Sequence, residues 1–293
     1  MEIARLLEEG GKILADSGVE DAATDARLLL GHCMQMSRTE LYLYGRNRVG
    51  SADLERFFAY IRRRSAREPV AYITGEQEFW SLPFEVNSSV LIPRPETEFL
   101  LETVLGNVSA VDRSQGCCLD LCCGSGVIAV VLAREINARV TAVDQSPEAL
   151  RLARRNCRRH GVDDLVAFVG ADLFEAFSKE VVFPLIVTNP PYVSSVEIDS
   201  ALQPEVADYE PHLALDGGSD GLSLIRRIAD RTLAHLTPGG MLFMEFGCTQ
   251  GEAVTALFTE TVQGKRFFEN IEILKDYSGR DRVLCGKANF YRE

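Results

Sequence analysis

The stretch "DLCCGSGVIA", residues 120–129, decides the fold that we expect for this 293-residue chain. An apolar run typical of a buried β-strand comes first, and a helix is expected after it. Gly124 and Gly126 lie between the two, in the expected turn. Ala129 lies three residues after Gly126, which completes the pattern G-x-G-x-x-G/A. Glycines at such a turn let the backbone pass close to a ligand, and the small third residue lets the helix pack on the strand. The pattern alone is a weak signal, so its surroundings have to decide the ligand.

Strands and helices alternate along the chain from about residue 115, which is typical of an α/β protein. Ser146, Pro147 and Gly161 support one of the helices, because they stand at its expected N-cap, first position and end. We expect a Rossmann-like domain with a mostly parallel, seven-stranded sheet that is closed by an antiparallel pair. The expected strands are 117–123, 138–144, 165–170, 183–189 and 239–247, followed by the closing pair 271–276 and 281–287.

The chain before this domain has a different pattern of secondary structure. Residues 2–68 read as helices, and the segment "LERFFAYI" places Leu54, Phe57, Phe58 and Ile61 on one helical face. Short β-rich pieces interrupted by Gly, Pro, Asn and Ser follow. We therefore predict a small helical domain over 1–70 that docks the substrate, a β-hairpin connector over 71–95, and the α/β domain over 96–293.

Composition and charge limit the classes of partner. The net charge is −12, which argues against binding to extended DNA, because phosphate neutralisation requires a basic surface. Two basic clusters, 62–67 and 151–160, are solvated helix faces or a docking patch for a nucleoprotein. No apolar run reaches the roughly 18 residues of a membrane span, and the acidic N-terminus does not resemble a signal peptide. We expect a cytoplasmic protein without a membrane partner.

Four of the eight cysteines crowd into residues 117–123. A zinc site usually pairs two C-x-x-C units across a longer gap, and no second pair follows here. Cysteines that alternate around a buried strand are more simply small apolar side chains. We expect no metal site.

Asp144 indicates a bound nucleoside. It ends the second expected strand, 20 residues after Gly124, where an acid can accept hydrogen bonds from both ribose hydroxyls. A helix-capping role is the alternative, but Ser146 already fills it. Two cofactors use this geometry: a dinucleotide, with its pyrophosphate on the helix N-terminus, or S-adenosylmethionine, which has no phosphate.

S-adenosylmethionine would need a carboxylate for its ammonium group, and Asp120 inside the first expected strand supplies one. The segment "GADLF", residues 170–174, would reach the adenine. Asp172 would accept from its exocyclic amine, while Leu173 and Phe174 would lie against its face. The alternative for the last two side chains is the hydrophobic core.

The segment "NPPY", residues 189–192, ends the fourth expected strand. Ligands of such sheets bind beyond the carboxyl ends of the strands, so Asn189 would enter the crevice. Its amide oxygen and the Pro190 carbonyl can each accept one hydrogen bond from an NH2 group. The ring of Tyr192 offers a face on which the planar group that carries this NH2 can stack. Pro190 and Pro191 hold that carbonyl in one direction, which limits reorganisation. Such a clamp would aim the lone pair of a weak nitrogen nucleophile at an electrophilic methyl group, and orientation alone can supply roughly 7–11 kcal/mol.

Several segments together resemble the HemK/PrmC family of protein-glutamine N5 methyltransferases, over nearly the whole chain after about residue 20. They are "REPVAYITGEQEFWSLPFEV" (67–86), "LIPRPETE" (91–98), "DLCCGSGVIA" (120–129), "AVDQSPEAL" (142–150), "VTNPPYV" (187–193), "EPHLALDGG" (210–218) and "DYSGRDRVL" (276–284). The resemblance implies a methyltransferase domain, a helical N-terminal domain and a connecting hairpin. It also implies that the substrate is the glutamine of the GGQ motif in class I peptide chain release factors.

The same resemblance implies roles for particular residues. The loop of Cys122, Cys123, Gly124, Ser125 and Gly126 would hold S-adenosylmethionine, later S-adenosylhomocysteine, together with Asp144. Asn189 would face both the cofactor and the glutamine amide. Such methyltransferases often have glycine at the position of Cys122 and threonine or another small residue at Cys123. Because a Cβ makes positive φ costly, we expect Cys122 to alter cofactor affinity.

Three other functions remain open at this point. A glutamine methyltransferase for a ribosomal protein shares every feature above. An adenine N6 methyltransferase acting on DNA or RNA also needs a clamp for a planar NH2, but should carry a basic recognition region. An NAD-dependent oxidoreductase shares the glycine pattern and leaves residues 189–192 unexplained. Among the histidines, His212 alone falls in a loop near the expected crevice, and we interpret it as structural.

Overall fold

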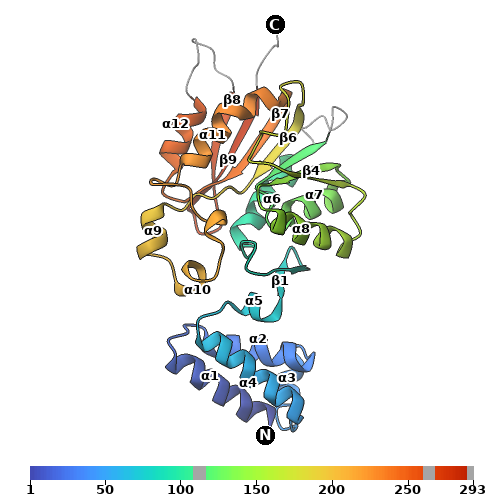
Figure 1. Ribbon diagram of the computed structural model, residues 1–293, viewed down its shortest axis with the longest axis vertical. Coiled ribbons are helices and arrows are strands. Elements are labelled where there is room, and N and C mark those ends of the chain that lie inside the picture. Colours follow the sequence, from blue (N-terminus) through green and yellow to red (C-terminus); the bar gives the residue numbers. More distant parts are fainter. Residues whose placement is uncertain (108–116, 260–267, 289–293) are drawn as a thin grey trace. The chain divides into compact units, whose positions relative to one another are not determined.

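The computed structural model describes residues 1–107, 117–259 and 268–288. Within them the chain forms two compact units (Figure 1). The first comprises Met1–Glu76 and Gln203–Tyr209, and the second comprises Gln77–Leu202 and Glu210–Glu293. The domain ranges 1–70, 71–95 and 96–293 remain predictions, and parts of the third (108–116, 260–267 and 289–293) lie outside the described residues.

The first unit is helical, as the sequence indicates. Its helices are α1 (Ile3–Asp16), α2 (Ala22–Met34), α3 (Arg38–Leu43), α4 (Ser51–Ser65), α5 (Val70–Thr74) and α10 (Pro204–Ala207). Leu6, Leu29 and Phe57 are fully buried at the centre of its apolar core. Phe57 and Ile61 carry the predicted apolar face of α4 inward.

A buried ion cluster holds the segment Gln203–Tyr209 within the helical unit. The guanidinium of Arg64 donates to Asp25 Oδ2 at 2.7 Å and to Glu205 Oε1 at 2.7 Å, and Arg67 donates to Glu205 Oε2 at 2.6 Å. Arg64 is buried and its partners are partly buried, so losing one of these pairs would leave a charge that water only partly solvates. These ion pairs therefore fix a segment whose sequence neighbours on both sides belong to the other unit.

The second unit is built on a seven-stranded sheet with the order β5-β4-β3-β6-β7-β9-β8. β3, β4, β5, β6 and β7 are parallel, whereas β9 pairs antiparallel with both β7 and β8, so the predicted Rossmann-like fold is confirmed. The strand order reverses at β3, which has β4 on one side and β6 on the other. The strands are β3 (Cys118–Leu121), β4 (Val140–Asp144), β5 (Val166–Gly170), β6 (Phe183–Thr188), β7 (Leu236–Glu245), β8 (Phe268–Lys275) and β9 (Asp281–Ala288).

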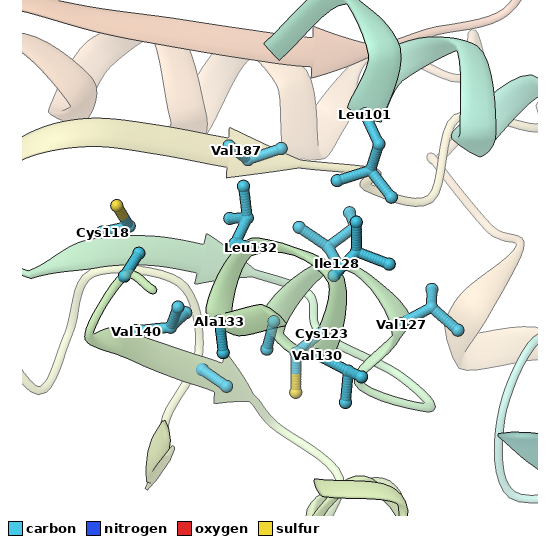
Figure 2. Close-up of a cluster of buried hydrophobic side chains, with 14 of the residues drawn as sticks. Leu101, Cys118, Cys123, Val127, Ile128, Val130, Leu132, Ala133, Val140 and Val187 are labelled. Carbon is cyan, nitrogen blue, oxygen red and sulfur yellow. The ribbon is translucent and has the colours of Figure 1, made fainter. Parts of the chain in front are cut away.

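Helices cover both faces of this sheet (Figure 1). The helices of one face are α6 (Pro95–Asn107), α7 (Val127–Ile136) and α8 (Pro147–Arg159), and those of the other are α11 (Ser223–Thr232) and α12 (Gly251–Thr259). Figure 2 shows part of the first face, where Ile128 and Leu132 of α7 lie close to Val187 of β6. The apolar run after the glycine turn is thus a helix buried on nearly all sides.

Two smaller features complete this unit. The short helix α9 (Ser195–Ser200) follows the NPPY segment, and the predicted hairpin consists of β1 (Glu76–Phe79) and β2 (Leu82–Glu85). Asn156 of α8 holds β2, because its side chain accepts from Glu85 N at 2.8 Å and donates to Glu85 O at 3.0 Å. None of the helices in the described part of the chain is long and apolar enough to cross a membrane.

Gly126 of the glycine turn lies close to Ala153 of α8. Its φ is +81°, and an added Cβ would lie 2.9 Å from the Cβ of Ala153. We expect Gly126→Ala to lower the free energy of unfolding by about 2–5 kcal/mol, from left-handed strain plus overpacking. Urea unfolding measures this loss.

Gly161→Ala is the matched control for that prediction. Gly161 also has a positive φ, +67°, but an added Cβ would meet nothing within 4 Å. It should lose only the left-handed cost, about 1–2 kcal/mol. Equal losses for the two variants would show that contact with Ala153 does not constrain the turn.

Candidate active site

A cavity of about 280 Å³ opens at the carboxyl ends of β3, β4, β5 and β6. Its position next to the strand reversal at β3 is where open α/β sheets bind their ligands. Most of the predicted site residues line it: Cys122, Cys123, Gly124, Ser125, Asp144, Asp172, Leu173, Asn189 and Pro191. Four others do not line it: Asp120, Gly126, Pro190 and Tyr192.

The loop after β3 has the left-handed backbone that the glycine pattern suggests. Cys122 has a φ of +60°, although it has a Cβ, and Gly124 has a φ of +51°. Two backbone bonds hold the turn: Cys123 N donates to Val143 O at 2.9 Å, and Gly126 N donates to Cys123 O at 2.7 Å. The strain anticipated at Cys122 is therefore present, and burial raises the pKa of its thiol, so the sulfur stays protonated.

Asp144 stabilises the same turn from the end of β4. Its Oδ2 accepts from Gly124 N at 2.9 Å, and its Oδ1 accepts from Ser146 N at 2.8 Å. Burial raises the pKa of this carboxyl, while the backbone donors oppose that effect. Ser146 caps α8 by accepting from Ala149 N, as predicted, so Asp144 is not the capping side chain. The carboxylate faces the cavity with its remaining lone pairs.

Asp120 lies beneath the loop, in the interior of the sheet. It is fully buried, its Oδ2 accepts from Ala129 N at 3.1 Å, and its Oδ1 has no partner among the described residues. Burial raises its pKa well above the usual range, and the charge of Asp144 raises it further. The predicted ammonium ligand thus sits behind the cavity wall rather than in it.

The segment after β5 divides its side chains between the cavity and the core. Leu173, with a φ of +50°, lines the cavity, and so does Asp172, whose Oδ2 accepts from Arg227 at 2.8 Å. Phe174 is 1% exposed and stacks on His235, with ring centroids 4.8 Å apart. Of the two readings of Phe174, the structure supports the core.

A connected set of hydrogen bonds supports the NPPY segment. Asn189 follows β6 directly, and its Nδ2 donates to Thr97 Oγ1 at 3.0 Å. Thr97 donates to Glu245 Oε2 at 2.7 Å, and the Tyr192 hydroxyl donates to Glu245 Oε1 at 2.9 Å. Gln250 Nε2 donates to the Tyr192 carbonyl at 2.9 Å, which fixes the backbone on the far side of the prolines.

Sequence reasoning missed three members of this set: Thr97, Glu245 and Gln250. The sequence predicts only that Glu245 lies inside the expected strand 239–247. The one signal for Glu245 is an acidic residue at the end of the run "MLFME", where a buried carboxyl requires partners. The cavity wall from Ser89 to Pro93 and the contributions of Leu213 and Leu224 were also unforeseen.

The charge of the cavity is negative. Asp144, Glu148 and Asp172 line it, and its described lining contains no Lys, Arg or His, although Arg227 from outside the lining pairs with Asp172 at 2.8 Å. A low-dielectric cleft lined by one sign of charge favours the opposite sign in its ligand. The cavity therefore suits a cation and opposes a pyrophosphate, which disfavours a dinucleotide.

Asp120 makes a pH dependence testable. The pKa of Asp120 is higher in the folded state than in the unfolded chain, so its protonated form stabilises the fold. This stabilisation is complete below the unfolded-chain pKa of about 3.9. It is lost as the pH rises through the folded-state pKa. In that window the unfolding free energy of the wild type should fall relative to that of Asp120→Asn, by up to about 1.4 kcal/mol per pH unit. Urea unfolding of both proteins across pH measures the difference. A difference that is independent of pH would contradict the assignment.

Comparison with solved structures gives the same architecture. A methyltransferase from Pyrococcus furiosus matches with a TM-score of 0.51, over 80% of this chain and 98% of that chain. The two sequences are 18% identical, so the likeness concerns the fold.

Comparison with known sequences covers both units. Residues 5–75 match the family described as PrmC N-terminal domain, and residues 95–219 match the family described as Methyltransferase small domain. A release factor glutamine methyltransferase of Geobacter sulfurreducens is 40% identical over 97% of this chain and 96% of its own length. A protein of the same name from Vibrio cholerae is 38% identical over 99% of this chain and 98% of its own length. The chain therefore belongs to the HemK/PrmC family of methyltransferases.

Proposed function

We propose that this protein transfers a methyl group from S-adenosylmethionine to the side-chain amide nitrogen of the glutamine in the GGQ motif of class I peptide chain release factors. Relatives about 40% identical over nearly the whole chain are named release factor glutamine methyltransferases, which supports the substrate. The observation that carries the chemistry is the placement of Asn189. It stands at the edge of an acidic cavity with its amide nitrogen bonded to protein, so its oxygen is left for a ligand.

The residues of the cavity fit S-adenosylmethionine. Its sulfonium and ammonium charges match the acidic lining, and the wall at Leu173 and Val143 offers apolar surface for an adenine. Asp144 would accept hydrogen bonds from the ribose hydroxyls. The loop from Cys122 to Gly126 would lie next to the amino acid end of the cofactor. When bound, this cofactor supplies an electrophilic methyl group, and S-adenosylhomocysteine is its product.

The protein's part in the reaction is orientation. Asn189 Oδ1 would accept one N–H group of the glutamine amide at the cavity edge. Pro190 and Tyr192 do not line the cavity, so for the second N–H group to reach the Pro190 carbonyl and for the amide plane to meet the Tyr192 ring, the substrate would have to reach past that edge. Holding both N–H groups turns the nitrogen lone pair toward the methyl carbon, and orientation of this kind can account for roughly 7–11 kcal/mol of a barrier. Forming the new C–N bond would leave the nitrogen with one proton too many, which would pass to solvent.

The helical unit is proposed to dock the release factor. Three neighbouring apolar side chains at the end of α3 are exposed: Tyr42 (87%), Leu43 (66%) and Tyr44 (48%). A glutamine and its two glycines offer little surface for recognition, so a second contact has to supply specificity. Release factors act on ribosomes, so the proposal also places the protein in the cytoplasm, with no direct contact to DNA or to a membrane.

Mass spectrometry of a release factor incubated with enzyme and methyl donor tests the activity. We expect one added methyl group, on the GGQ glutamine, and no addition when that glutamine is alanine. Asn189→Ala should lower kcat at least about 100-fold, since it removes an acceptor aimed at the reacting group. Labelling of a ribosomal protein or of DNA, with the release factor unmodified, would contradict the proposal.

The docking role predicts a split between substrates. The double variant Tyr42→Ser, Leu43→Ser should raise KM for the full release factor by about 10-fold or more, the size of a lost hot spot. KM for a short GGQ peptide should stay unchanged. Tyr277→Ser, at another exposed aromatic (80%), is the matched control. An unchanged KM for the full release factor would exclude this surface.

A further inference from the structure

The NPPY segment rests on a buried carboxylate that takes no part in the chemistry proposed above. Glu245, the last residue of β7, is 0% exposed, and Thr97, in the first turn of α6, is 3% exposed. The chain of contacts runs from Asn189 Nδ2 to Thr97 Oγ1 (3.0 Å) and from Thr97 Oγ1 to Glu245 Oε2 (2.7 Å). Tyr192 reaches the other oxygen, Oε1, at 2.9 Å.

The number of protons sets the direction of every bond in this chain. The hydroxyl of Thr97 donates to Glu245 Oε2 at 2.7 Å, which uses the only proton that this hydroxyl has. Thr97 Oγ1 then has only lone pairs to offer to Asn189, and of the two ends of an amide only the NH2 can donate to them. The oxygen of Asn189 must therefore point the other way, toward the cavity.

We propose that Glu245 and Thr97 are positioning residues, which orient the Asn189 amide so that it presents Oδ1, and not Nδ2, to the NH2 group of the substrate glutamine. The inference rests on the proposed function of the same site. We call the hydrogen bonds from Asn189 to Thr97 and from Thr97 to Glu245 the relay. Without it, either end of the Asn189 amide could face the substrate, because the two ends have nearly the same shape. In the inverted orientation the Asn189 NH2 would face the NH2 of the substrate glutamine, and two donors cannot form a hydrogen bond. The second arm, from the Tyr192 hydroxyl to Glu245 Oε1, fixes the position of the Tyr192 side chain three residues after Asn189.

The neighbours of Glu245 act on the charge of its carboxyl group in opposite directions. Burial raises the pKa of Glu245, but the hydroxyls of Thr97 and Tyr192 and the guanidinium of Arg282 favour the ionised form, while Glu96 opposes it. Burial also raises the pKa of Tyr192 well above its usual range, so its phenol keeps the proton that it donates. Arg282 is itself buried and donates from Nη1 to Phe246 O at 3.2 Å.

A reversed relay gives the sharpest test. Asn189→Asp keeps an acceptor for the substrate but faces the lone pairs of Thr97 with an oxygen, so kcat should fall by about 10- to 100-fold, the value of a charged hydrogen bond. Adding Glu245→Gln reverses the two bonds that link position 245, Thr97 and position 189, and leaves the bond from Tyr192 unchanged. The Gln NH2 donates to Thr97, Thr97 donates to the aspartate, and the Gln oxygen still accepts from Tyr192.

We expect the double variant Asn189→Asp, Glu245→Gln to recover at least about 10-fold in kcat over Asn189→Asp alone, the value of one restored hydrogen bond to a charged group. Adding Thr97→Val should abolish the recovery, because valine cannot pass on the bond. Thr97→Val alone should lower kcat with little change in calorimetric affinity for S-adenosylhomocysteine, and Thr97→Ser should regain most of the rate.

Two controls separate the relay from simpler outcomes. Thr103→Val makes the same change on the same helix, where the hydroxyl only donates to Phe99 O, and should leave kcat unchanged. Methylation of a release factor by the wild type must be observed first, and its absence would overturn the proposed function itself. If the wild type is active but the double variant is no faster than Asn189→Asp, the relay is wrong.

Discussion

The two oxygens of Glu245 hold together three parts of the methyltransferase unit that are far apart in sequence. Thr97 reaches one oxygen from α6 and Tyr192 reaches the other from the segment after β6, while Glu245 itself ends β7. A carboxylate without water must find donors, since an unpaired buried charge costs several kcal/mol. The requirement to satisfy one buried anion therefore fixes where the NPPY segment leaves the sheet and how its amide is turned.

The same logic operates on the cofactor side of the cavity. Asp144 accepts from the backbone of the glycine turn and from the start of α8, so one carboxylate sets the shape of the turn and its distance from the helix. Because the strand order reverses at β3, the turn after β3 and the segment after β6 reach the same crevice. The fold thus places the glycine turn, which Asp144 shapes, next to the Asn189 amide, which Glu245 orients through Thr97.

Local patterns predicted much of this site. Asp144 ends a strand, whereas Gly124 and Asn189 follow one, and ligands of such sheets bind beyond the carboxyl ends of the strands. The features that the sequence did not predict depend on contacts between residues far apart in the chain. Thr97 meets Asn189 across 92 residues, and Arg64 meets Glu205 across 141. The second of these pairs sets Gln203–Tyr209 in the helical unit, and no composition signal in that segment distinguishes it from its neighbours.

Strain in the cavity wall follows from the same supports. Cys122 and Leu173 both adopt positive φ, at +60° and +50°, which costs a residue with a Cβ roughly 1–2 kcal/mol. Such conformations persist only where surrounding bonds over-determine them. At Cys122 the next residue is bonded to Val143 of β4, and the side chain packs against the apolar layer on one face of the sheet. Glycine there would release the strain but would also lose that packing and add backbone entropy to the unfolded chain. The two effects oppose each other, so cysteine is tolerated at a turn that favours glycine.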